Sequence, residues 1–370
     1  MRHLAPWPRR TLWLLIASAL VLLPLAPWGS LPAGRPLPGA APVAAASAPP
    51  AVLPQSVHLR FGSPGSVSDA GVILGDARGS FREQGIDLEF VPFQSALDTA
   101  VPLASGDLAA AGGVFGISLL NAVDRGLALK AVADKGGSGP GFEFVQVPVR
   151  SDLLASGEVR TPQDLRGHRI AMTATRSGGE LVVARMLAQQ GVGIDEVELV
   201  TLGYPDMLAA FGNRAIDAAL VIEPTLTAGV ARGLFTAWEP GRSSSAMGGP
   251  YQAGLLYYGS QLQGQPDLAR RFMVGYLQGV RAYNDAFGRG EGRADAVRVL
   301  AEQTAVKDPA LYDQMQMPAL DPDGRINRAS LQAEIDYYRA RGYYTGSATL
   351  DSVVDSSFAE SAAQALGPYR

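Results

Sequence analysis

From residue 57 onward, short apolar segments of strand length alternate with segments whose apolar residues recur at helical spacing. This alternation is typical of a mostly parallel β-sheet flanked by helices. The predicted strands are residues 57–61, 86–91, 108–111, 129–134, 144–149, 169–172, 197–201, 218–222 and 254–258. The predicted helices are residues 68–79, 117–125, 178–190, 206–212, 224–232, 266–287, 294–304 and 330–341. A further helix is expected to open at the capping-box pattern of Ser95 and Asp98 and to run to about residue 105.

The order of these elements predicts two lobes rather than one continuous sheet. The first series ends with the β-like run of residues 144–149, which meets a polar loop at residues 151–159, and we place the first crossover there. A second series of alternating strands and helices follows. Residues 241–250, which are dense in Gly, Ser and Pro, indicate the return crossover. Two doubly wound halves joined in this way form a cleft at the C-terminal ends of their strands.

The expected lobe boundaries follow from these crossovers. We assign residues 55–148 and 252–370 to lobe 1 and residues 149–251 to lobe 2. A loose internal similarity supports two related halves. Residues 98–111 and 206–220 each begin with Asp, continue as a helical pattern and enter a strand through Asp and small apolar residues. The expected fold is therefore α/β, and each lobe contains a mostly parallel sheet flanked by helices.

The N-terminal residues have the pattern of an export signal. Arg2, Arg9 and Arg10 precede an uncharged, largely apolar run at residues 11–28, and small residues and prolines follow it. The run is short for a membrane span, which needs about 20 residues. We expect residues 1–48 to be a signal peptide cleaved near Ala48, with a flexible leader to about residue 54, and the exported chain to be periplasmic. The alternative is an uncleaved N-terminal anchor.

Composition narrows the possible functions. The 370 residues exceed the size at which a single core usually stops growing, which agrees with two lobes. With 31 Lys and Arg against 35 Asp and Glu, the net charge of −4 gives no excess of positive charge for nucleic acid. The chain has no Cys and three His, so we expect no disulfide, no metal site and no cofactor.

Catalytic signatures are missing from the sequence. There is no G-x-S-x-G elbow, no Walker A loop, no H-E-x-x-H helix and no G-x-G-x-x-G after a strand. We expect His58, inside a predicted strand, and His168, in a polar turn, to be structural or surface residues. We therefore expect no catalytic residue and no enzyme activity.

Two strand-to-helix junctions are candidate ligand contacts. Small residues let backbone N–H groups approach a ligand, hydroxyls add donors, and the following helix start is partly positive, so such junctions suit anionic groups. Arg176 strengthens this reading, because a guanidinium at a helix start is unfavourable unless it meets an anion or solvent. The alternative is that a strand-to-helix turn needs Gly and Ser for its geometry alone. The candidates are Ser63, Gly65 and Ser66 at the first junction and Thr173, Thr175, Arg176, Ser177 and Gly178 at the second.

Five further candidates follow other strands or flank the linker. Phe115 could stack on a ligand or be a core residue, and Gly137 belongs to a glycine-rich stretch that could be a cleft loop or a surface excursion. Glu223 follows a predicted strand, where it could accept from a ligand, pair with Arg176 or be solvated. Tyr204 and Tyr251 add aromatic hydrogen-bonding edges near the mouth of the cleft and the linker.

Three stretches carry a resemblance to a known family. They are residues 100–107 (AVPLASGD), residues 161–171 (TPQDLRGHRIA), and Asp217-Ala218-Ala219 followed by Glu223-Pro224. Together with the export signal and the turn after the first strand, they look like the solute-binding proteins of nitrate/sulfonate/taurine-type ABC transporters, which share a fold with thiamine-precursor synthases. The resemblance covers about residues 57–365.

The resemblance implies a periplasmic binding protein that closes two lobes on a small solute and delivers it to an ABC transporter permease. It carries ligand contacts over to Ser63, Gly65, Ser66, Phe115, Thr175, Arg176, Ser177 and Glu223. Arg176 favours a sulfonate or carboxylate, whereas Glu223 would suit an amine or an aminopyrimidine. We expect an anionic organic solute and a monomeric protein.

Two alternatives stay open. The same fold family includes enzymes, namely pyrimidine-precursor synthases of thiamine biosynthesis and menaquinone-pathway proteins. The Cys-rich motifs expected of the former are absent, and an export signal does not suit a cytosolic enzyme. The other alternative is an extracytoplasmic ligand sensor.

Overall fold

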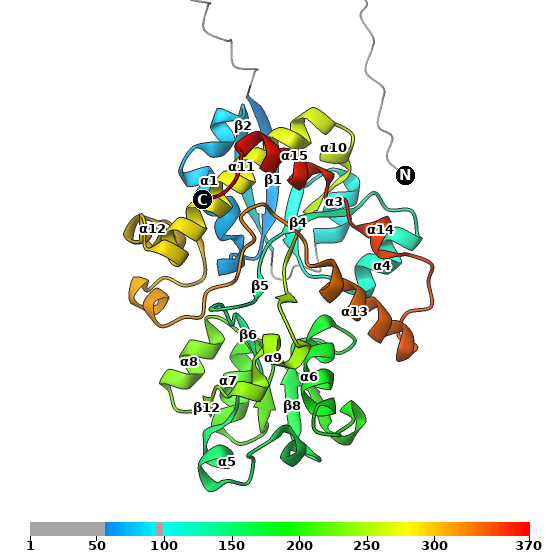
Figure 1. Ribbon diagram of the computed structural model, residues 1–370, viewed down its shortest axis with the longest axis vertical. Helices are drawn as coiled ribbons and strands as arrows, with labels where there is room; N and C mark the ends of the chain where they lie inside the picture. Colours follow the sequence, from blue (N-terminus) through cyan, green and yellow to red (C-terminus); the bar gives the residue numbers. More distant parts are fainter. Residues whose placement is uncertain (1–55, 94–98) are drawn as a thin grey trace, which may run out of the picture. The chain divides into compact units, whose positions relative to one another are not determined.

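The computed structural model describes residues 56–93 and 99–370. The predicted signal peptide, its cleavage near Ala48 and the capping box of Ser95 and Asp98 lie outside the described residues. Within them, the strands form two five-stranded sheets and two short two-stranded ladders. Figure 1 shows the second sheet and its helices in green, between segments that carry the chain out of the first sheet and back into it.

The first sheet has the order β2-β1-β3-β14-β4 and forms the centre of the first lobe. β1 is parallel to both β2 and β3, while β14 is antiparallel to β3 and β4, so four of the five strands share one direction. The strands are β1 (Val57–Ser63), β2 (Ile86–Pro92), β3 (Ala110–Gly113), β4 (Lys130–Asp134) and β14 (Leu255–Tyr258).

The second sheet has the order β12-β7-β10-β8-β9 and forms the centre of the second lobe. β8 is parallel to β9 and β10, and β7 is antiparallel to β10 and β12. The strands are β7 (Val149–Arg150), β8 (Arg169–Met172), β9 (Glu198–Thr201), β10 (Ala218–Ala219) and β12 (Phe235–Thr236). Both sheets are mostly parallel, as the sequence predicts.

The two crossovers run side by side. β5 (Gly137–Ser138), on the way out, pairs with β13 (Tyr251–Gln252), on the way back, in an antiparallel ladder. A second ladder joins β6 (Val145–Gln146) to β11 (Val221–Ile222). The predicted lobe boundaries after residues 148 and 251 lie close to these ladders, and their positions stay a prediction.

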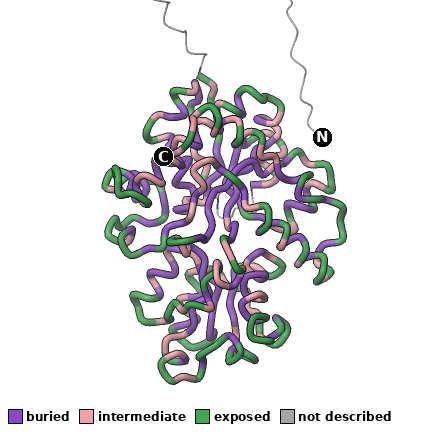
Figure 2. The backbone as a smooth tube through the Cα atoms, viewed as in Figure 1, coloured by how far each residue is buried: buried purple, intermediate pink, exposed green. Residues whose placement is uncertain are grey.

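Helices flank both sheets, and the buried residues follow the strands and the inner faces of the helices (Figure 2). The helices of the first lobe are α1 (Ala70–Ala77), α2 (Ser80–Glu83), α3 (Ala100–Ser105), α4 (Ile117–Asp124), α10 (Ser260–Gln263), α11 (Pro266–Asn284), α12 (Arg293–Gln303), α13 (Arg328–Ala340), α14 (Leu350–Val353) and α15 (Ser357–Leu366). Those of the second lobe are α5 (Ser151–Ser156), α6 (Gly178–Ala188), α7 (Tyr204–Gly212), α8 (Thr225–Ala231) and α9 (Ser243–Met247).

Glycines bring α1 and α11 into backbone contact in the core of the first lobe. A Cβ at Gly75 would lie 2.8 Å from the Gly275 carbonyl oxygen, and a Cβ at Gly279 would overlap the Gly71 carbonyl oxygen. Tyr276, on the same face of α11, donates its hydroxyl to the Asp134 carbonyl oxygen at 2.5 Å. Tyr276 is fully buried, so it packs in the core of the first lobe.

Several predicted elements are wrong in detail. The predicted polar loop at residues 151–159 begins with a helix, α5. Leu153 is its buried residue, and the helix is too short to show an apolar period in the sequence. The predicted linker at residues 241–250 contains the short helix α9. Three of its five residues are serines, so its composition indicated a loop. The strand at residues 218–222 is interrupted at Leu220, and β3 begins two residues later than predicted. The sequence also missed α14 and α15.

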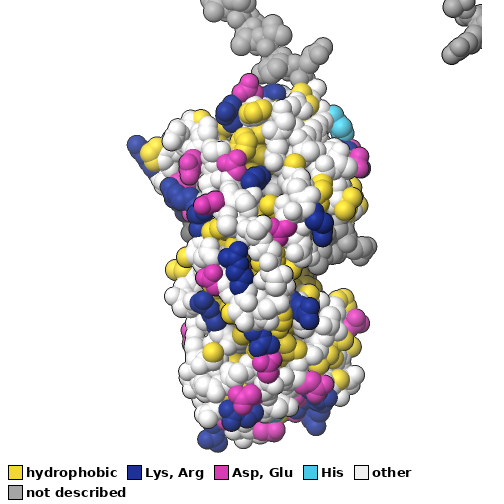
Figure 3. Space-filling model, turned by 90° about the vertical axis from the view of Figure 1, so that its right-hand side faces the viewer, with side chains coloured by type: hydrophobic (Ala, Val, Ile, Leu, Met, Phe, Trp, Pro, Cys, Tyr) yellow, Lys and Arg dark blue, Asp and Glu magenta, His cyan; other side chains and the backbone are white. Residues whose placement is uncertain are grey.

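The surface carries charges of both signs. On the face shown in Figure 3, Lys and Arg side chains are interspersed with Asp and Glu. In the part of the chain that the structure covers, no helix has both the length and the apolarity to cross a bilayer.

The glycine contact between α1 and α11 can be tested by Gly279→Ala. The new methyl group must push the two helices apart, so we expect a loss of about 1–3 kcal/mol in the free energy of unfolding. Gly288→Ala is the control, because a Cβ at Gly288 meets no atom within 4 Å. Equal stability of the two variants in denaturant titrations would contradict the close helix contact.

Candidate functional site

The turn after β1 is held by one buried carboxylate. Ser63 Oγ donates to Asp69 Oδ2 at 2.6 Å and accepts from the Gly65 backbone N–H at 2.9 Å. Ser66 caps the 3-10 turn Val67–Asp69, and its own N–H donates to Asp69 Oδ2 at 3.3 Å. Gly65 has a φ of 67°, which a glycine adopts without strain. The three predicted residues of this junction therefore form one compact turn.

A buried ion pair supports this turn from the residue that follows β4. Lys135 Nζ donates to Asp69 Oδ1 and to Ser68 Oγ, both at 2.7 Å, and the Lys135 and Asp69 side chains are 3% and 0% exposed. Burying these charges is tolerable because each has a charged partner and further hydrogen bonds. The pair fixes the end of β1 against the start of the outgoing crossover.

The second predicted junction forms the N-terminus of α6. Ser177 is the N-cap, and its Oγ accepts from the Glu180 N–H at 3.4 Å. Arg176 has a φ of 55°, which is uncommon for a non-glycine residue, and its N–H donates to Glu180 Oε2 at 2.6 Å. Thr173 and Thr175 precede it and are exposed. The junction is therefore a rigid turn with an exposed guanidinium.

A backbone contact joins the two lobes at this turn. Gly116, in the loop between β3 and α4, forms an isolated antiparallel bridge with Ser177. Gly116 belongs to the first lobe and Ser177 to the second. The end of a first-lobe strand thus faces the start of a second-lobe helix, which is the arrangement that two doubly wound halves predict.

Helix α13 of the first lobe extends this contact over α6. The Tyr337 hydroxyl donates to Glu180 Oε1 at 2.7 Å. Arg341 makes two hydrogen bonds to the Asp195 carboxylate, at 2.6 and 2.7 Å. The Arg176 guanidinium lies over the Tyr343 ring, 5.0 Å from its centroid. These contacts form a polar clasp between the lobes.

Glu334 of α13 is a site residue that the sequence analysis missed. Its carboxyl group is 1% exposed and lies against Gly178, where a Cβ would come within 2.6 Å of Glu334 Oε2. The Tyr338 hydroxyl donates to the same oxygen at 2.9 Å. Burial raises the pKa of Glu334 to about 8. The sequence could have indicated Glu334, because it is an acidic residue within the apolar stripe that Leu331, Ile335 and Tyr338 form on the helix.

Aromatic hydroxyls surround this carboxyl group. Burial raises the pKa of Tyr204 to about 12, opposed by a hydrogen bond with Thr173. Burial, followed by the nearby Glu334 and Tyr204, raises the pKa of Tyr251 well above its usual value. Gly137 lies in the ladder beside Tyr251, paired with Gln252. Gly178, next to the N-cap Ser177, therefore lies against Glu334, and Tyr251 lies near both Glu334 and Tyr204. Thr173 is hydrogen-bonded to Tyr204, and Gly137 belongs to the same ladder as Tyr251.

Two predicted residues lie elsewhere. Phe115 is 4% exposed and packs in the hydrophobic cluster of the first lobe, which favours its alternative as a core residue. Among the described residues Glu223 does not pair with Arg176, and it is only 2% exposed, so it is not the solvated residue that one alternative described. Its Oε1 accepts from the Gln316 N–H at 2.8 Å and from Thr227 Oγ1 at 3.0 Å. Burial raises the pKa of Glu223.

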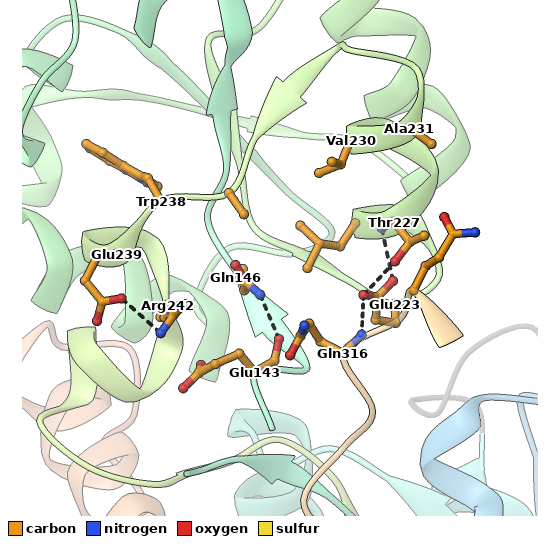
Figure 4. Close-up of a pocket in the computed structure, with 13 residues that line it drawn as sticks. Glu143, Gln146, Glu223, Thr227, Val230, Ala231, Trp238, Glu239, Arg242 and Gln316 are labelled. Atoms are coloured by element: carbon orange, nitrogen blue, oxygen red, sulfur yellow. Dashed lines mark hydrogen bonds and ion pairs between the residues drawn. The ribbon is translucent and has the colours of Figure 1, made fainter. Parts of the chain in front are cut away.

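Glu223 lines a cavity of about 350 Å³ (Figure 4). Its walls come from α8, the outgoing crossover, the segment around Trp238 and the first-lobe residues Gln314 and Gln316. The Glu223–Gln316 hydrogen bond joins the two lobes in the wall of this cavity. The molecule thus presents two regions between its lobes: the α6 region with an exposed guanidinium, and the Glu223 cavity with several carboxyl groups.

A protein-family model matches residues 67–285, under the description NMT1/THI5 like. A search of curated proteins finds no match. Among solved structures, the alkanesulfonate-binding protein SsuA from Xanthomonas axonopodis pv. citri, bound to MOPS, is 19% identical, with a TM-score of 0.62, and the match covers 81% of this chain and 99% of that chain. The periplasmic nitrate-binding protein NrtA from Synechocystis PCC 6803 is 14% identical, with a TM-score of 0.65 and coverage of 84% and 89%.

These similarities confirm the predicted family and the two-lobe fold of periplasmic binding proteins. An enzyme shares the fold as well. The desulfurization enzyme DSZB is 15% identical, with a TM-score of 0.56, and the match covers 84% of this chain and 99% of that chain. At these identities the solved structures establish the fold and not the ligand.

The buried carboxyl group of Glu334 predicts a specific pH dependence of stability. Its pKa rises from 4.5 in the unfolded chain to about 8 in the folded protein. The folded state is therefore favoured below the lower value and loses stability as pH rises through about 8, by at most about 1.4 kcal/mol per pH unit. Glu334→Gln keeps an acceptor for Tyr338 and removes the titration.

We expect the free energy of unfolding, measured in denaturant at several pH values, to fall more steeply from pH 4.5 to 8 in the native protein than in Glu334→Gln. Other buried acids, such as Asp134, titrate in both proteins and cancel in the comparison. Parallel pH profiles would show that Glu334 is not a buried neutral acid.

Proposed function

Because the chain belongs to the NMT1/THI5-like family and has the two-lobe fold of periplasmic binding proteins, we propose that it is an extracytoplasmic solute-binding protein. It captures a small anionic organic solute, of the sulfonate or carboxylate type, between its lobes and delivers it to the permease of an ABC importer. The observation that carries this proposal is the bridge between Gly116 and Ser177, which sets a strand end of one lobe against a helix start of the other.

The charge at the start of α6 favours an anion. Arg176 forms no ion pair with any carboxylate of residues 56–93 and 99–370, and its guanidinium is held by stacking over Tyr343. Ser177 and the first turn of α6 supply a hydroxyl and the partly positive helix end. Glu334, with a pKa of about 8, is mostly protonated at neutral pH, so it does not repel an anion and has a proton to donate.

The two lobes open and close by bending at the two crossovers. Bending near residues 147–150 and 248–251 separates the lobes, breaks the α13 contacts with α6 and uncovers the buried part of the α6 junction, at Gly178 and Glu334. A solute that touches both lobes favours the closed arrangement by its differential affinity. The permease then recognises the closed monomer outside the cytoplasm, after the signal peptide has been removed near Ala48.

The structural similarity to DSZB supports one other candidate, an enzyme on the same fold. The two functions differ in the fate of the compound, since a binding protein releases it unchanged. To distinguish the two functions, each compound that raises Tm is incubated with the protein and then analysed by mass spectrometry. Recovery of the unchanged compound supports binding, and formation of a product supports the enzyme.

The solute class is tested by a thermal-shift screen of sulfonates, aromatic carboxylates, nitrate, bicarbonate and pyrimidines. We expect sulfonates or carboxylates to raise Tm.

Arg176→Ala should weaken binding of the best anion by about 1.5–3 kcal/mol in calorimetry, the range for a hydrogen bond to a charged group. Arg232→Ala, which removes an exposed guanidinium from the end of α8, is the matched control and should leave affinity unchanged. Equal affinity of the two variants would show that Arg176 does not contact the solute.

A further inference from the structure

The contact between α13 and α6 contains a buried acid that faces the other lobe. Glu334 belongs to α13 of the first lobe and is 1% exposed. Part of its cover is Gly178, the first residue of α6 in the second lobe, where a Cβ would lie 2.6 Å from Glu334 Oε2 and 2.7 Å from Oε1. Figure 1 shows α13 beside α6. Separation of the lobes therefore opens this carboxyl group to water.

The closed arrangement offers little to a negative charge at Glu334. Its Oε2 accepts from the Tyr338 hydroxyl at 2.9 Å, and no Lys, Arg or His of the described residues forms an ion pair with this carboxyl group. The Arg176 guanidinium, at the same junction, lies over the Tyr343 ring instead. A buried carboxylate without a cation is costly, whereas the protonated carboxyl group is neutral and is buried at much lower cost.

The titratable groups that face Glu334 add no positive charge. Tyr338 lies on the same helix, Tyr251 belongs to β13 and Tyr257 belongs to β14. Burial raises the pKa of all three hydroxyls, so they stay neutral while Glu334 titrates. From α6 the charged group nearest to this cluster is Glu180, which is a second acid.

The partly positive start of α6 does not offset this deficit, because Glu180 already occupies it. Glu180 lies in the first turn of α6, and its Oε2 accepts from the Arg176 N–H at 2.6 Å. Its Oε1 accepts from the Tyr337 hydroxyl of α13 at 2.7 Å. A negative charge at Glu334 would meet this like charge across the contact between the lobes. The closed arrangement therefore suits one carboxylate, Glu180, and one neutral acid, Glu334.

We propose that Glu334 is a proton-dependent latch between the lobes: its neutral carboxyl group allows the closed arrangement, and loss of its proton favours the open one. The charged form gains water on opening, because the cover that Gly178 provides is withdrawn. The latch acts in the protein without any solute, so it does not rest on the proposed function. A rise in pH shifts the lobes toward the open arrangement.

Proton linkage sets the direction and the pH range of this shift. An exposed glutamate keeps its ordinary pKa, whereas burial in the closed arrangement raises the pKa of Glu334 from 4.5 to about 8. The ratio of open to closed molecules should therefore rise by up to about tenfold per pH unit between these two values and level off above the higher one. Asp134 and Glu223 also have raised pKa values, but they titrate alike in the native protein and in Glu334→Gln.

The distance between the lobes can be measured in the full chain without solute. The sequence has no cysteine, so Asn121→Cys on α4 and Gln190→Cys just after α6 give one exposed label site in each lobe. Pulsed electron paramagnetic resonance of nitroxide labels at these sites reports the populations of short and long distances. We expect the long distance to gain population from about pH 5 to about pH 8 in the native background. In Glu334→Gln, which keeps an acceptor for Tyr338 without a titrating proton, the short distance should persist throughout.

Two further variants separate the latch from a general effect of pH. Asp336→Asn removes an exposed carboxylate from the same helix and should keep the native pH profile. Gly178→Ala places a methyl group against the Glu334 carboxyl group, so the long distance should be populated already at about pH 5. This variant tests the contact with Glu334 itself unchanged, and a denaturant titration checks that each variant is folded.

Four results would overturn the latch. They are a native distance that does not change with pH, a long distance at every pH, equal pH profiles of the native protein and Glu334→Gln, and a Gly178→Ala variant that stays closed. The anion screen does not enter this measurement, so the latch and the proposed function can fail separately.

Discussion

The antiparallel pairing of β5 with β13 is the constraint on which the rest of the structure depends. It holds the outgoing and returning segments of the chain together between the two sheets. Since the chain leaves each sheet near the C-terminal ends of its parallel strands, the junctions that follow those strands are brought to the same region. The bridge between Gly116 and Ser177 is the direct consequence.

The contacts between the lobes divide into two chemically different regions. Around the start of α6 lie a guanidinium that pairs with no carboxylate of the described residues, a helix N-terminus and a buried acid with a raised pKa, and together they favour negative charge. Beside α8, the carboxyl groups that line the cavity outnumber its guanidinium groups. Both regions include residues of both lobes, so under the proposed function a solute that contacts both lobes favours their closure.

Much of the fold could be predicted from the sequence because its elements are locally encoded. The alternation of apolar segments identified most strands and the long helices, and α11 and α13 have clear apolar faces. Short elements such as α5 and α9 escaped detection, because their few residues are set by tertiary packing rather than by a repeating pattern.

The candidate site was predictable where the chain supplies it in consecutive residues. Thr173 to Gly178 and the turn from Ser63 to Ser66 follow strands and could be recognised from Gly, Ser and Thr. Glu334 could not, because it reaches the α6 junction from a helix more than 150 positions away in the sequence. Phe115 shows the opposite limit of sequence-based prediction, because its position after a strand made it a candidate contact. A residue at such a position can equally well enter the core, and Phe115 does.

The central claim is that the lobes of this chain meet at the Gly116 and Ser177 turns. The chain contains no cysteine, so the double variant Gly116→Cys/Ser177→Cys introduces one defined pair. Bridged residues on antiparallel segments have Cα atoms about 4.5–5.5 Å apart, a separation that a disulfide spans. The most direct measurement is the yield of intramolecular disulfide under mild oxidation. The account predicts rapid and nearly complete formation, and a pair that stays reduced would contradict it.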